Sequence, residues 1–426
     1  MICIPQKPDP TEAADLQPSI TAVVLTHNRT ERCQDSIRHN SKTLSGFNSR
    51  ILLINNGKLP ISPSGLSSKV PFDVVNCGTN LGIAARNIAL SNQTSEFLLM
   101  MDDDAYISPD HVQQMVMTFR LDPSIAAVSF RIRNAEENES CLLPTVFHGC
   151  ACGFRSSALR EIGGYPTDFM YYGEEYCVAF RLYQKGYHIV RLDGTKHIFH
   201  AKDNKGRDKD RIIRLLVRNN IRTWSSLFPR SKILAASLDT LQRYALVARK
   251  ENAFKGFIMG CTEIPRAIIG GLRDRVPLSS ETFDRITMAN QILSTCRLLK
   301  AGGIHEAIIC STGKFPSIWL EHFKNNGISI KSFWDTNTCW RGQKIHGVPV
   351  ITSDQVGDWK TACQQHDTGK LAWIAGTGSL TENDFWKETF KSAGIFPSNA
   401  SATAESTLSS GNFDLLHDCN LSVFIP

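Results

Sequence analysis

The chain has 426 residues, of which 42% are apolar and 21% are charged, and its formal net charge is +6. This length exceeds that of one typical domain, so we expect two or three domains in a globular protein. No apolar run reaches the roughly 18 residues of a membrane-spanning helix, and the 13 cysteines show no disulfide-framework spacing. Because the N-terminus lacks a secretory signal pattern, we expect a cytoplasmic protein, with a peripheral location at the inner face of the plasma membrane as one option.

Residues 1–18 are polar and rich in proline, which predicts a loose arm. From residue 19 onward, apolar runs of strand length alternate with helical segments such as LGIAARNIALSNQ. This alternation predicts parallel strand pairing in an α/β fold. The expected strands are, in chain order, ITAVVLTHN, RILLINN, FDVVNC and EFLLMMDDD.

Three of these strands end in polar clusters, namely Thr26-His27-Asn28-Arg29, Asn55-Asn56-Gly57 and Asp102-Asp103-Asp104. Sheets of this kind bind their ligands beyond the carboxyl ends of the strands. We therefore expect the three clusters to contribute to one binding site.

The acidic triplet is a candidate cation site. Asp102 and Asp104 alternate along the strand, so both side chains are expected on one side, whereas Asp103 points away or begins a turn. Mg²⁺ and Mn²⁺ prefer oxygen ligands, and a bound cation would relieve the repulsion between adjacent carboxylates. The alternative is that the three residues only form a turn, which aspartate favours.

The rest of the chain continues the α/β pattern, passes through a basic helical segment and then begins a second α/β pattern. Between Lys202 and Arg275, 17 Lys and Arg residues stand against 7 Asp and Glu residues, which suggests an anionic partner for this block. The expected domains are 19–228 and 291–395, with a basic helical segment over 229–290 and a tail over 396–426.

Residues 207–228 are predicted to form an amphipathic helix with a stripe of arginines on one side. Two interpretations stay open, a solvated basic face or contact with a diphosphate or an anionic membrane surface. The stripe consists of Arg211, Arg214, Arg218 and Arg222, which recur every three or four residues.

The ordered motifs VVLTHNR, INNG, NLGIAARN and LLMMDDDAYISP are followed by GCACGFRSSALREIGGYPTDFMYYGEEYCVAFRLYQKGYHI. Over roughly residues 20–225 this set resembles the family 2 glycosyltransferases with the GT-A fold, in the branch that includes bacterial rhamnosyltransferases and galactofuranosyltransferases. The resemblance implies inverting, metal-dependent transfer of a sugar from a UDP- or dTDP-linked donor. It also implies a glycan or lipid-linked acceptor in surface polysaccharide synthesis.

By this resemblance, the first-strand cluster meets the base and ribose, the second cluster reads the edge of the base, and the helix after the third strand lies near the nucleotide. An arginine on that helix could counter phosphate charge, or it could lie on a solvated face. The implied nucleotide-sugar contacts are Thr26, Asn28, Arg29, Asn56, Arg86, Asn87, Asp102 and Asp103.

The resemblance also implies a metal site. Asp102 and Asp104 match the family's Asp-x-Asp motif, with Asp104 as the direct ligand of Mn²⁺ or Mg²⁺. His200 matches a histidine that reaches the metal or the diphosphate, and His197 is the competing candidate.

Glu174-Glu175 matches the family's Glu-Asp pair, which places Glu175 at the position of the general base and makes both residues catalytic candidates. Such a base is needed because the acceptor hydroxyl must lose its proton as it attacks. Independently of the resemblance, two adjacent glutamates in an aromatic setting repel each other, which raises a pKa toward useful values. The alternative is a pair of acids that only favours a helix N-terminus.

The segment 291–395 resembles a small Rossmann-like domain of sugar-modifying and acyltransferase proteins. Its turn, Ser311 to Pro316, lacks a full G-x-G-x-x-G, so packing, homo-oligomerisation or acceptor binding is favoured over cofactor binding. Two other functions stay open for the whole chain, a nucleotidyltransferase on the same fold and a non-catalytic nucleotide-sugar-binding scaffold. We expect no nucleic-acid partner.

Overall fold

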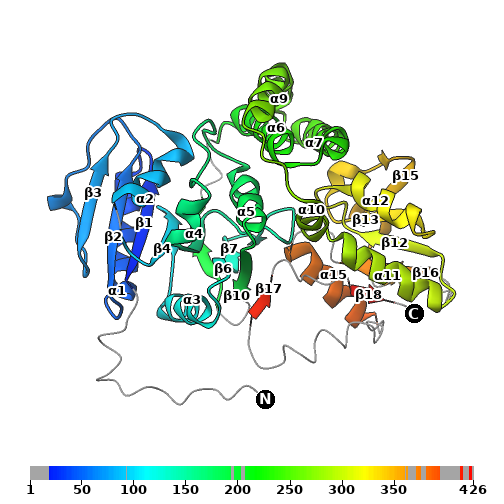
Figure 1. The fold of residues 1–426 in the computed structure, drawn as a ribbon, viewed down its shortest axis with the longest axis horizontal. Helices are drawn as coiled ribbons and strands as arrows, with labels where there is room; N and C mark the ends of the chain where they lie inside the picture. The colour runs from blue at the N-terminus through cyan, green and yellow to red at the C-terminus, as the bar shows by residue number, and fades with distance from the viewer. Residues whose placement is uncertain are drawn as a thin grey trace, which may run out of the picture. The chain divides into compact units, whose positions relative to one another are not determined.

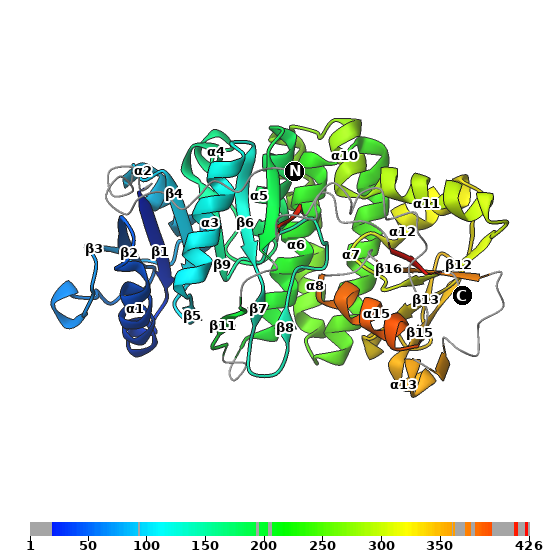
Figure 2. The same ribbon diagram turned by 90° about the horizontal axis from the view of Figure 1, so that it is seen from below.

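The computed structural model (Figures 1 and 2) contains two compact units. The first comprises residues 1–139, 147–205 and 410–416, and the second comprises 140–146, 206–409 and 417–426. The expected N-terminal arm and most of the expected tail lie outside the described residues. The structure describes residues 19–92, 94–192, 196–202, 207–359, 361–362, 371–375, 380–393, 413–415 and 422–424.

The first unit is built on an eight-stranded sheet with the order β17-β10-β6-β9-β4-β1-β2-β3. The four expected strands pair in parallel, as predicted, and only β9 and β17 run antiparallel to their neighbours. The strands are β1 (Ile20–Thr26), β2 (Ser49–Asn55), β3 (Phe72–Asn76), β4 (Phe97–Asp102), β6 (Ile125–Phe130), β9 (Ala151–Arg155), β10 (His188–Leu192) and β17 (Phe413–Leu415).

Helices α1 (Thr30–Leu44) and α3 (Pro109–Leu121) pack against one side of this sheet. Their buried residues join alternate strand residues, such as Val24, in one hydrophobic cluster. This alternation is the period-2 pattern of a strand whose one face is buried by helices. Two further helices of this unit are α4 (Ser156–Glu161) and α5 (Glu174–Gln184).

The expected helix over LGIAARNIALSNQ forms as two short pieces, a 3₁₀ helix at Gly82–Asn87 and α2 at Ile88–Asn92. The reason is local. Gly82 has a left-handed φ of 64°, and an added Cβ there would lie 2.2 Å from the carbonyl oxygen of Met170. The amide of Ile83 donates to that same oxygen over 2.6 Å, so the chain is pinned to a distant loop and starts with a tight turn.

A small second sheet, ordered β5-β11-β7-β8, follows the carboxyl ends of the large sheet. Its strands are β5 (Ala105–Tyr106), β7 (Ile132–Arg133), β8 (Asn138–Glu139) and β11 (Ile198–His200). Because β5 starts immediately after the acidic triplet, this sheet brings residues from far along the chain to the triplet.

The second unit combines a layer of helices with a six-stranded sheet ordered β14-β15-β13-β12-β16-β18. Strands β12, β13, β15 and β16 pair in parallel, as expected for a second α/β domain. The sheet elements are β12 (Glu306–Cys310), α12 (Pro316–Asn325), β13 (Ser329–Asp335), β14 (Lys344–Ile345), β15 (Val348–Thr352), α13 (Ser353–Val356), β16 (Leu371–Ala375), α15 (Leu380–Ser392) and β18 (Ser422–Phe424).

The helical layer of this unit begins with the arginine-striped helix, α6. No helix in the described part of the chain is both long enough and apolar enough to span a bilayer. The division into units groups α6 with the second unit, and the domain boundaries expected from the sequence stay a prediction. The layer consists of α6 (Lys209–Leu227), α7 (Arg230–Lys250), α8 (Phe254–Thr262), α9 (Ile264–Arg273), α10 (Ser280–Ile286) and α11 (Ala289–Ala301).

Candidate functional site

Three predicted metal ligands, Asp102, Asp104 and His200, lie together at the carboxyl end of β4. Each offers one ligand atom, and these atoms all lie within 4.8 Å of one another. The Nε2 of His200 is 3.2 Å from Oδ1 of Asp104. Two carboxylates and one imidazole form a donor set that suits Mn²⁺ and also accommodates Mg²⁺. His200, rather than His197, is therefore the histidine of this cluster.

Strand pairing explains why these residues meet. Asp102 is the last residue of β4, where it stands in register with Leu25 of the parallel neighbour β1. Strand β11 pairs antiparallel with β5 and sets His200 opposite Ala105, the residue after Asp104. The pairing of β11 with β5 thus brings together residues almost a hundred positions apart in the sequence, and no local sequence pattern shows this pairing.

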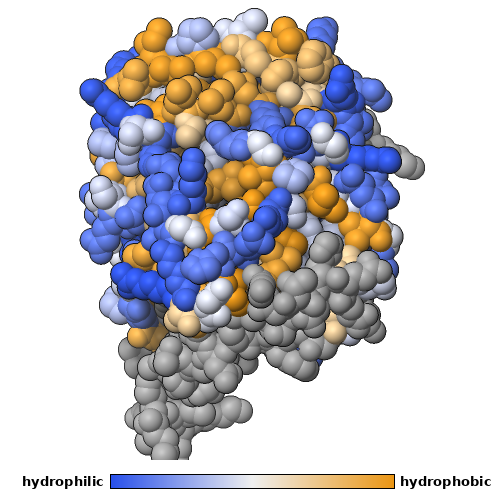
Figure 3. Space-filling model, turned by 90° about the vertical axis from the view of Figure 1, so that its right-hand side faces the viewer, coloured by the Kyte–Doolittle hydropathy of each residue, from blue (hydrophilic) through white to orange (hydrophobic). Residues whose placement is uncertain are grey.

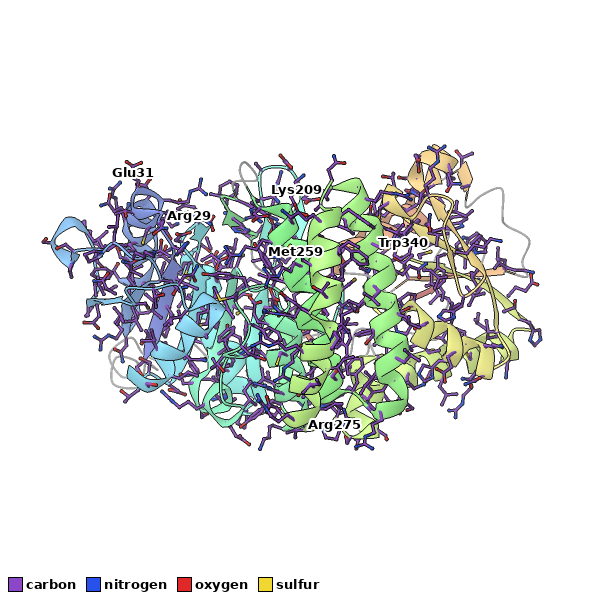
Figure 4. All side chains as sticks on the ribbon, turned by 90° about the horizontal axis from the view of Figure 1, so that it is seen from above. Arg29, Glu31, Lys209, Met259, Arg275 and Trp340 are labelled. Atoms are coloured by element: carbon purple, nitrogen blue, oxygen red, sulfur yellow. The ribbon has the colours of Figure 1, made fainter. Side chains whose placement is uncertain are left out.

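Asp103, the middle residue of the triplet, turns inward and is held by the first-strand cluster. Its Oδ2 accepts a hydrogen bond from Thr26 Oγ1 at 2.6 Å, and its Oδ1 lies 3.2 Å from Arg29 Nη1. The same Arg29 nitrogen is 3.0 Å from Asp104 Oδ2. Burial raises the pKa of Asp103 to about 6, although Arg29 and Thr26 act in the opposite direction. Arg29, labelled in Figure 4 at the start of α1, thus balances charge within the triplet.

Glu139 is a site residue that the sequence analysis missed. Its Oε2 is 3.0 Å from Nδ1 of His200 and 3.4 Å from Nε2 of His148, and its Oε1 accepts from Asn134 at 2.6 Å. Burial would raise the pKa of Glu139, but the hydrogen bonds from His200 and Asn134 outweigh it and hold the pKa at about 2. Glu139 lies in the polar run EENES, which has the pattern of a loop and no mark of a site.

His200 is therefore held through both ring nitrogens. Burial alone would lower the pKa of His200, but hydrogen bonds with Asp104, Cys150 and Glu139 raise it to about 12. A carboxylate on the second nitrogen of a metal-binding histidine fixes the orientation of the ring and increases its basicity. Glu139 occupies that position toward His200.

Arg86 is buried and bridges the triplet to a neighbouring loop. Its Nη2 donates to Oδ1 of Asp102 at 2.7 Å, its Nη1 donates to the carbonyl of Gly149 at 3.0 Å, and its guanidinium lies 5.6 Å from the ring centroid of Tyr165. The Arg86 side chain is 1% exposed, whereas that of Asp102 is 41% exposed. The interpretation of Arg86 as part of a solvated helix face is therefore wrong. The positive charge of Arg86 therefore offsets the charge of the Asp102 carboxylate, and part of the Asp102 side chain stays accessible to a ligand.

The Glu174-Glu175 pair opens α5, directly after Gly173 with its left-handed φ of 84°. Burial raises the pKa of Glu174, and the charge of Glu175 raises it further. The pKa of Glu175 is also raised, mainly by burial. Oε2 of Glu174 has no hydrogen-bond partner among the described residues. The expected repulsion within the pair is present, and burial adds to it.

Gly149 connects the glutamate pair to the triplet. A Cβ at this position would lie 2.8 Å from Oε1 of Glu175, so a larger residue here would displace that carboxylate. The carbonyl of Gly149 also accepts the hydrogen bond from Nη1 of Arg86. Through Arg86 and Gly149, the carboxylates of Asp102 and Glu175 belong to one connected site.

Asn56 and Asn87 are used mainly to shape loops around the site. The buried amide of Asn56 accepts from the backbone of Leu81 at 2.7 Å and donates to the carbonyl of Gly82 at 3.0 Å. The amide of Asn87 makes two hydrogen bonds with the backbone of Tyr165, at 2.8 and 2.9 Å. Contact of either residue with a nucleotide stays a prediction.

Asn28 differs from these two residues because its side chain is exposed. Its backbone has a left-handed φ of 58°, a conformation that asparagine tolerates better than most residues. A Cβ on Gly57 would lie 2.6 Å from Asn28 Oδ1, so the first two polar clusters touch each other. The three clusters therefore gather at one edge of the sheet, and nucleotide contact by Asn28 stays a prediction.

Residues 21–162 match the family model "Glycosyl transferase family 2". The uncharacterized glycosyltransferase YwdF of Bacillus subtilis (strain 168) is 27% identical over 99 residues, which cover 22% of this chain and 36% of that protein. The chain thus spans little more than a third of the length of this curated relative.

Two solved structures are also similar. The mannosyltransferase PcManGT from Pyrobaculum calidifontis, in complex with GDP-Man and Mn²⁺, is 19% identical with a TM-score of 0.38, covering 61% of this chain and 74% of that one. TarS 1–349 of S. aureus in complex with UDP-GlcNAc is 13% identical with a TM-score of 0.42, covering 65% and 86%.

Proposed function

Because residues 21–162 match the family model of the family 2 glycosyl transferases, we propose that the chain transfers a sugar from a nucleotide-diphosphate sugar to an acceptor hydroxyl. The observation that carries the proposal is the cluster of Asp102, Asp104 and His200 at the carboxyl edge of the sheet. Similar proteins include one whose structure holds GDP-Man with Mn²⁺ and one whose structure holds UDP-GlcNAc.

The cluster fits a divalent cation. Asp102, Asp104 and His200 would hold Mn²⁺ or Mg²⁺, which supplies positive charge to the diphosphate that leaves the sugar. Glu139 fixes His200 for this purpose, and Arg86 keeps Asp102 in place. The donor that we propose carries UDP or dTDP.

Glu175 is the general base of the proposed reaction. The acceptor oxygen attacks the anomeric carbon from the side opposite the diphosphate as that bond breaks, which inverts the anomeric configuration. The hydroxyl proton passes to the Glu175 carboxylate. The raised pKa of Glu175 makes it a stronger base than an exposed glutamate. The acceptor that we propose is a glycan or lipid-linked sugar of a surface polysaccharide.

The proposal is tested by thermal shift with a panel of nucleotide sugars and Mn²⁺, followed by transfer assays. We expect one donor to stabilise the wild type, and Asp104→Ala to lose that stabilisation. Asp35→Ala, in which the carboxylate removed is exposed on α1, is the matched control. Stabilisation that survives in Asp104→Ala would contradict the metal site.

Glu175→Gln separates a transferase from a binding protein. Because general-base catalysis contributes about 10²- to 10⁴-fold, transfer should fall by that factor while donor stabilisation is retained. Glu96→Gln, at an exposed position just before β4, should transfer like the wild type. Donor binding by the wild type without turnover on any acceptor would instead support the scaffold alternative.

A further inference from the structure

Two arginines of the α6 stripe, Arg214 and Arg222, form ion pairs with acids at the ends of α8 and α9. Nε of Arg214 donates to Oε1 of Glu263 at 2.7 Å, between α8 and α9, and Nη2 of Arg222 lies 2.5 Å from Oδ2 of Asp274, just after α9. Helices α8 and α9 both pack along α6. Arg222, which is 12% exposed, is largely covered, whereas the side chain of Arg214 is 37% exposed, so a solvated basic face stays open for the rest of the stripe.

Glycines form much of the side of α8 and α9 that faces α6. A Cβ on Gly256 would lie 2.1 Å from the carbonyl oxygen of Asp210, and one on Gly260 would lie 2.9 Å from Cβ of Val217. Farther along, a Cβ on Gly271 would lie 2.5 Å from Cβ of Ser225. The two helices thus follow α6 in the same direction at close approach, and Ala267, Phe257, Ile264 and Ile268 fill the space between the glycines.

Large apolar side chains occupy the opposite side of the two helices. Fourteen large apolar side chains are exposed among the described residues, and six of them lie within 254–276, so they form a cluster rather than a scatter. Figure 3 shows apolar surface along its upper edge, over the part of the unit where Figure 1 draws α9, and Figure 4 labels Met259 on α8. We call this set the α8–α9 face, and it consists of Phe254, Ile258, Met259, Ile269, Leu272 and Val276, exposed by 38–68%.

Cations outnumber acids in the segment 254–276, which holds four Lys and Arg residues against two acids. The two acids of this segment, Glu263 and Asp274, are paired with the arginines of α6. Lys255 and Arg266 are exposed and make no ion pair with any residue that the structure describes. On a helical wheel, Arg266 and Arg273 border Ile269 and Leu272, which places cations at the rim of the apolar surface.

From this arrangement we propose that the α8–α9 face lies on the surface of an anionic lipid bilayer. A helix pair with large apolar residues outward, cations at the rim and both acids paired with arginines matches an interfacial helix, which lies in the membrane plane and does not cross it. The cations match phospholipid headgroups of negative charge. An apolar protein partner would explain the hydrophobic residues but not the exposed Lys255 and Arg266 beside them.

The test is co-sedimentation of the full chain with vesicles of phosphatidylcholine, with and without added phosphatidylglycerol. We expect binding to the anionic vesicles that weakens as salt is raised, because surface attraction is screened within a Debye length. The double variant Ile269→Asp with Leu272→Asp should bind at least tenfold more weakly, because each residue loses the burial of its apolar surface. Lys255→Gln with Arg266→Gln should weaken binding about fivefold per removed charge.

Leu121→Asp is the matched control, because Leu121 on α3 and Ile269 are both 68% exposed. Leu121→Asp should bind vesicles like the wild type. Equal binding to neutral and anionic vesicles, or none to either, overturns the proposal. So does a dimer in analytical ultracentrifugation that Ile269→Asp with Leu272→Asp dissociates, because a second copy would then cover the face. The assay requires no sugar transfer, so its outcome is independent of the proposed reaction.

Discussion

Two neighbouring glycines of α9 offer a sharp test of how closely this helix approaches α6. In Gly271→Ala the new Cβ would lie 2.5 Å from Cβ of Ser225 and 2.9 Å from the carbonyl oxygen of Arg222. In Gly270→Ala the nearest atom would be Nε of Arg222 at 3.1 Å, which belongs to a flexible side chain. The new methyl group would therefore meet the backbone of α6 at position 271 but only the movable Arg222 side chain at position 270.

The expected magnitudes follow from two opposing terms. Alanine is better than glycine in a helix interior by about 1 kcal/mol. Overpacking costs about 1–3 kcal/mol, and the short contacts at Gly271 favour the upper half of that range. We expect Gly271→Ala to lower the free energy of unfolding by about 1–2 kcal/mol. Gly270→Ala should leave it unchanged or raise it by up to about 1 kcal/mol.

The assay is denaturant unfolding followed by tryptophan fluorescence. All 7 tryptophans lie within 206–409, so this signal reports on the second unit alone. The two variants should differ in the denaturant concentration at the unfolding midpoint, with the same dependence of the free energy of unfolding on denaturant. Equal stability of Gly270→Ala and Gly271→Ala would refute the close packing of α9 on α6.

Three further predictions concern buried charges. Arg86→Lys should lower the free energy of unfolding by about 1–3 kcal/mol, because a single ammonium nitrogen cannot take the positions of the two guanidinium nitrogens that donate to Gly149 and Asp102. Far-UV circular dichroism would measure this, and wild-type stability would contradict it. Glu139→Gln should lower the pKa of His200, because the Glu139 carboxylate is one of the groups that raise it. Histidine NMR would show this, and an unchanged pKa would argue against the contact. Burial raises the pKa of Asp239 to about 7 from 3.8, so its contribution to stability is complete below pH 3.8 and is lost as pH rises through about 7. The stability of Asp239→Asn relative to the wild type should therefore increase by up to about 4 kcal/mol as pH rises from 3.8 to about 7, measured by tryptophan-detected unfolding. If the stabilities of the two proteins changed with pH in the same way, the reasoning would be wrong.

Local patterns were sufficient for the architecture and for part of the site. Apolar runs of strand length alternating with helices predicted both α/β sheets, because side-chain periodicity and burial are local properties. The placement of polar clusters at strand ends predicted that Thr26, Asn56 and the acidic triplet would gather at one edge, since parallel strands end on the same side. The resemblance to a family selected His200 and the Glu174-Glu175 pair.

Which side chains meet was decided by the tertiary structure. Glu139 reaches His200 across 61 positions through the register of a small sheet, and no periodicity in EENES encodes that register. Arg86 is buried against Asp102 because a left-handed Gly82 pins its segment to a distant loop. The stripe on α6 has helical spacing, but that spacing cannot tell whether solvent, lipid or another helix lies over it. The glycines of α8 and α9 allow these two helices to pack closely against α6, and the large apolar side chains of α8 and α9 then point outward.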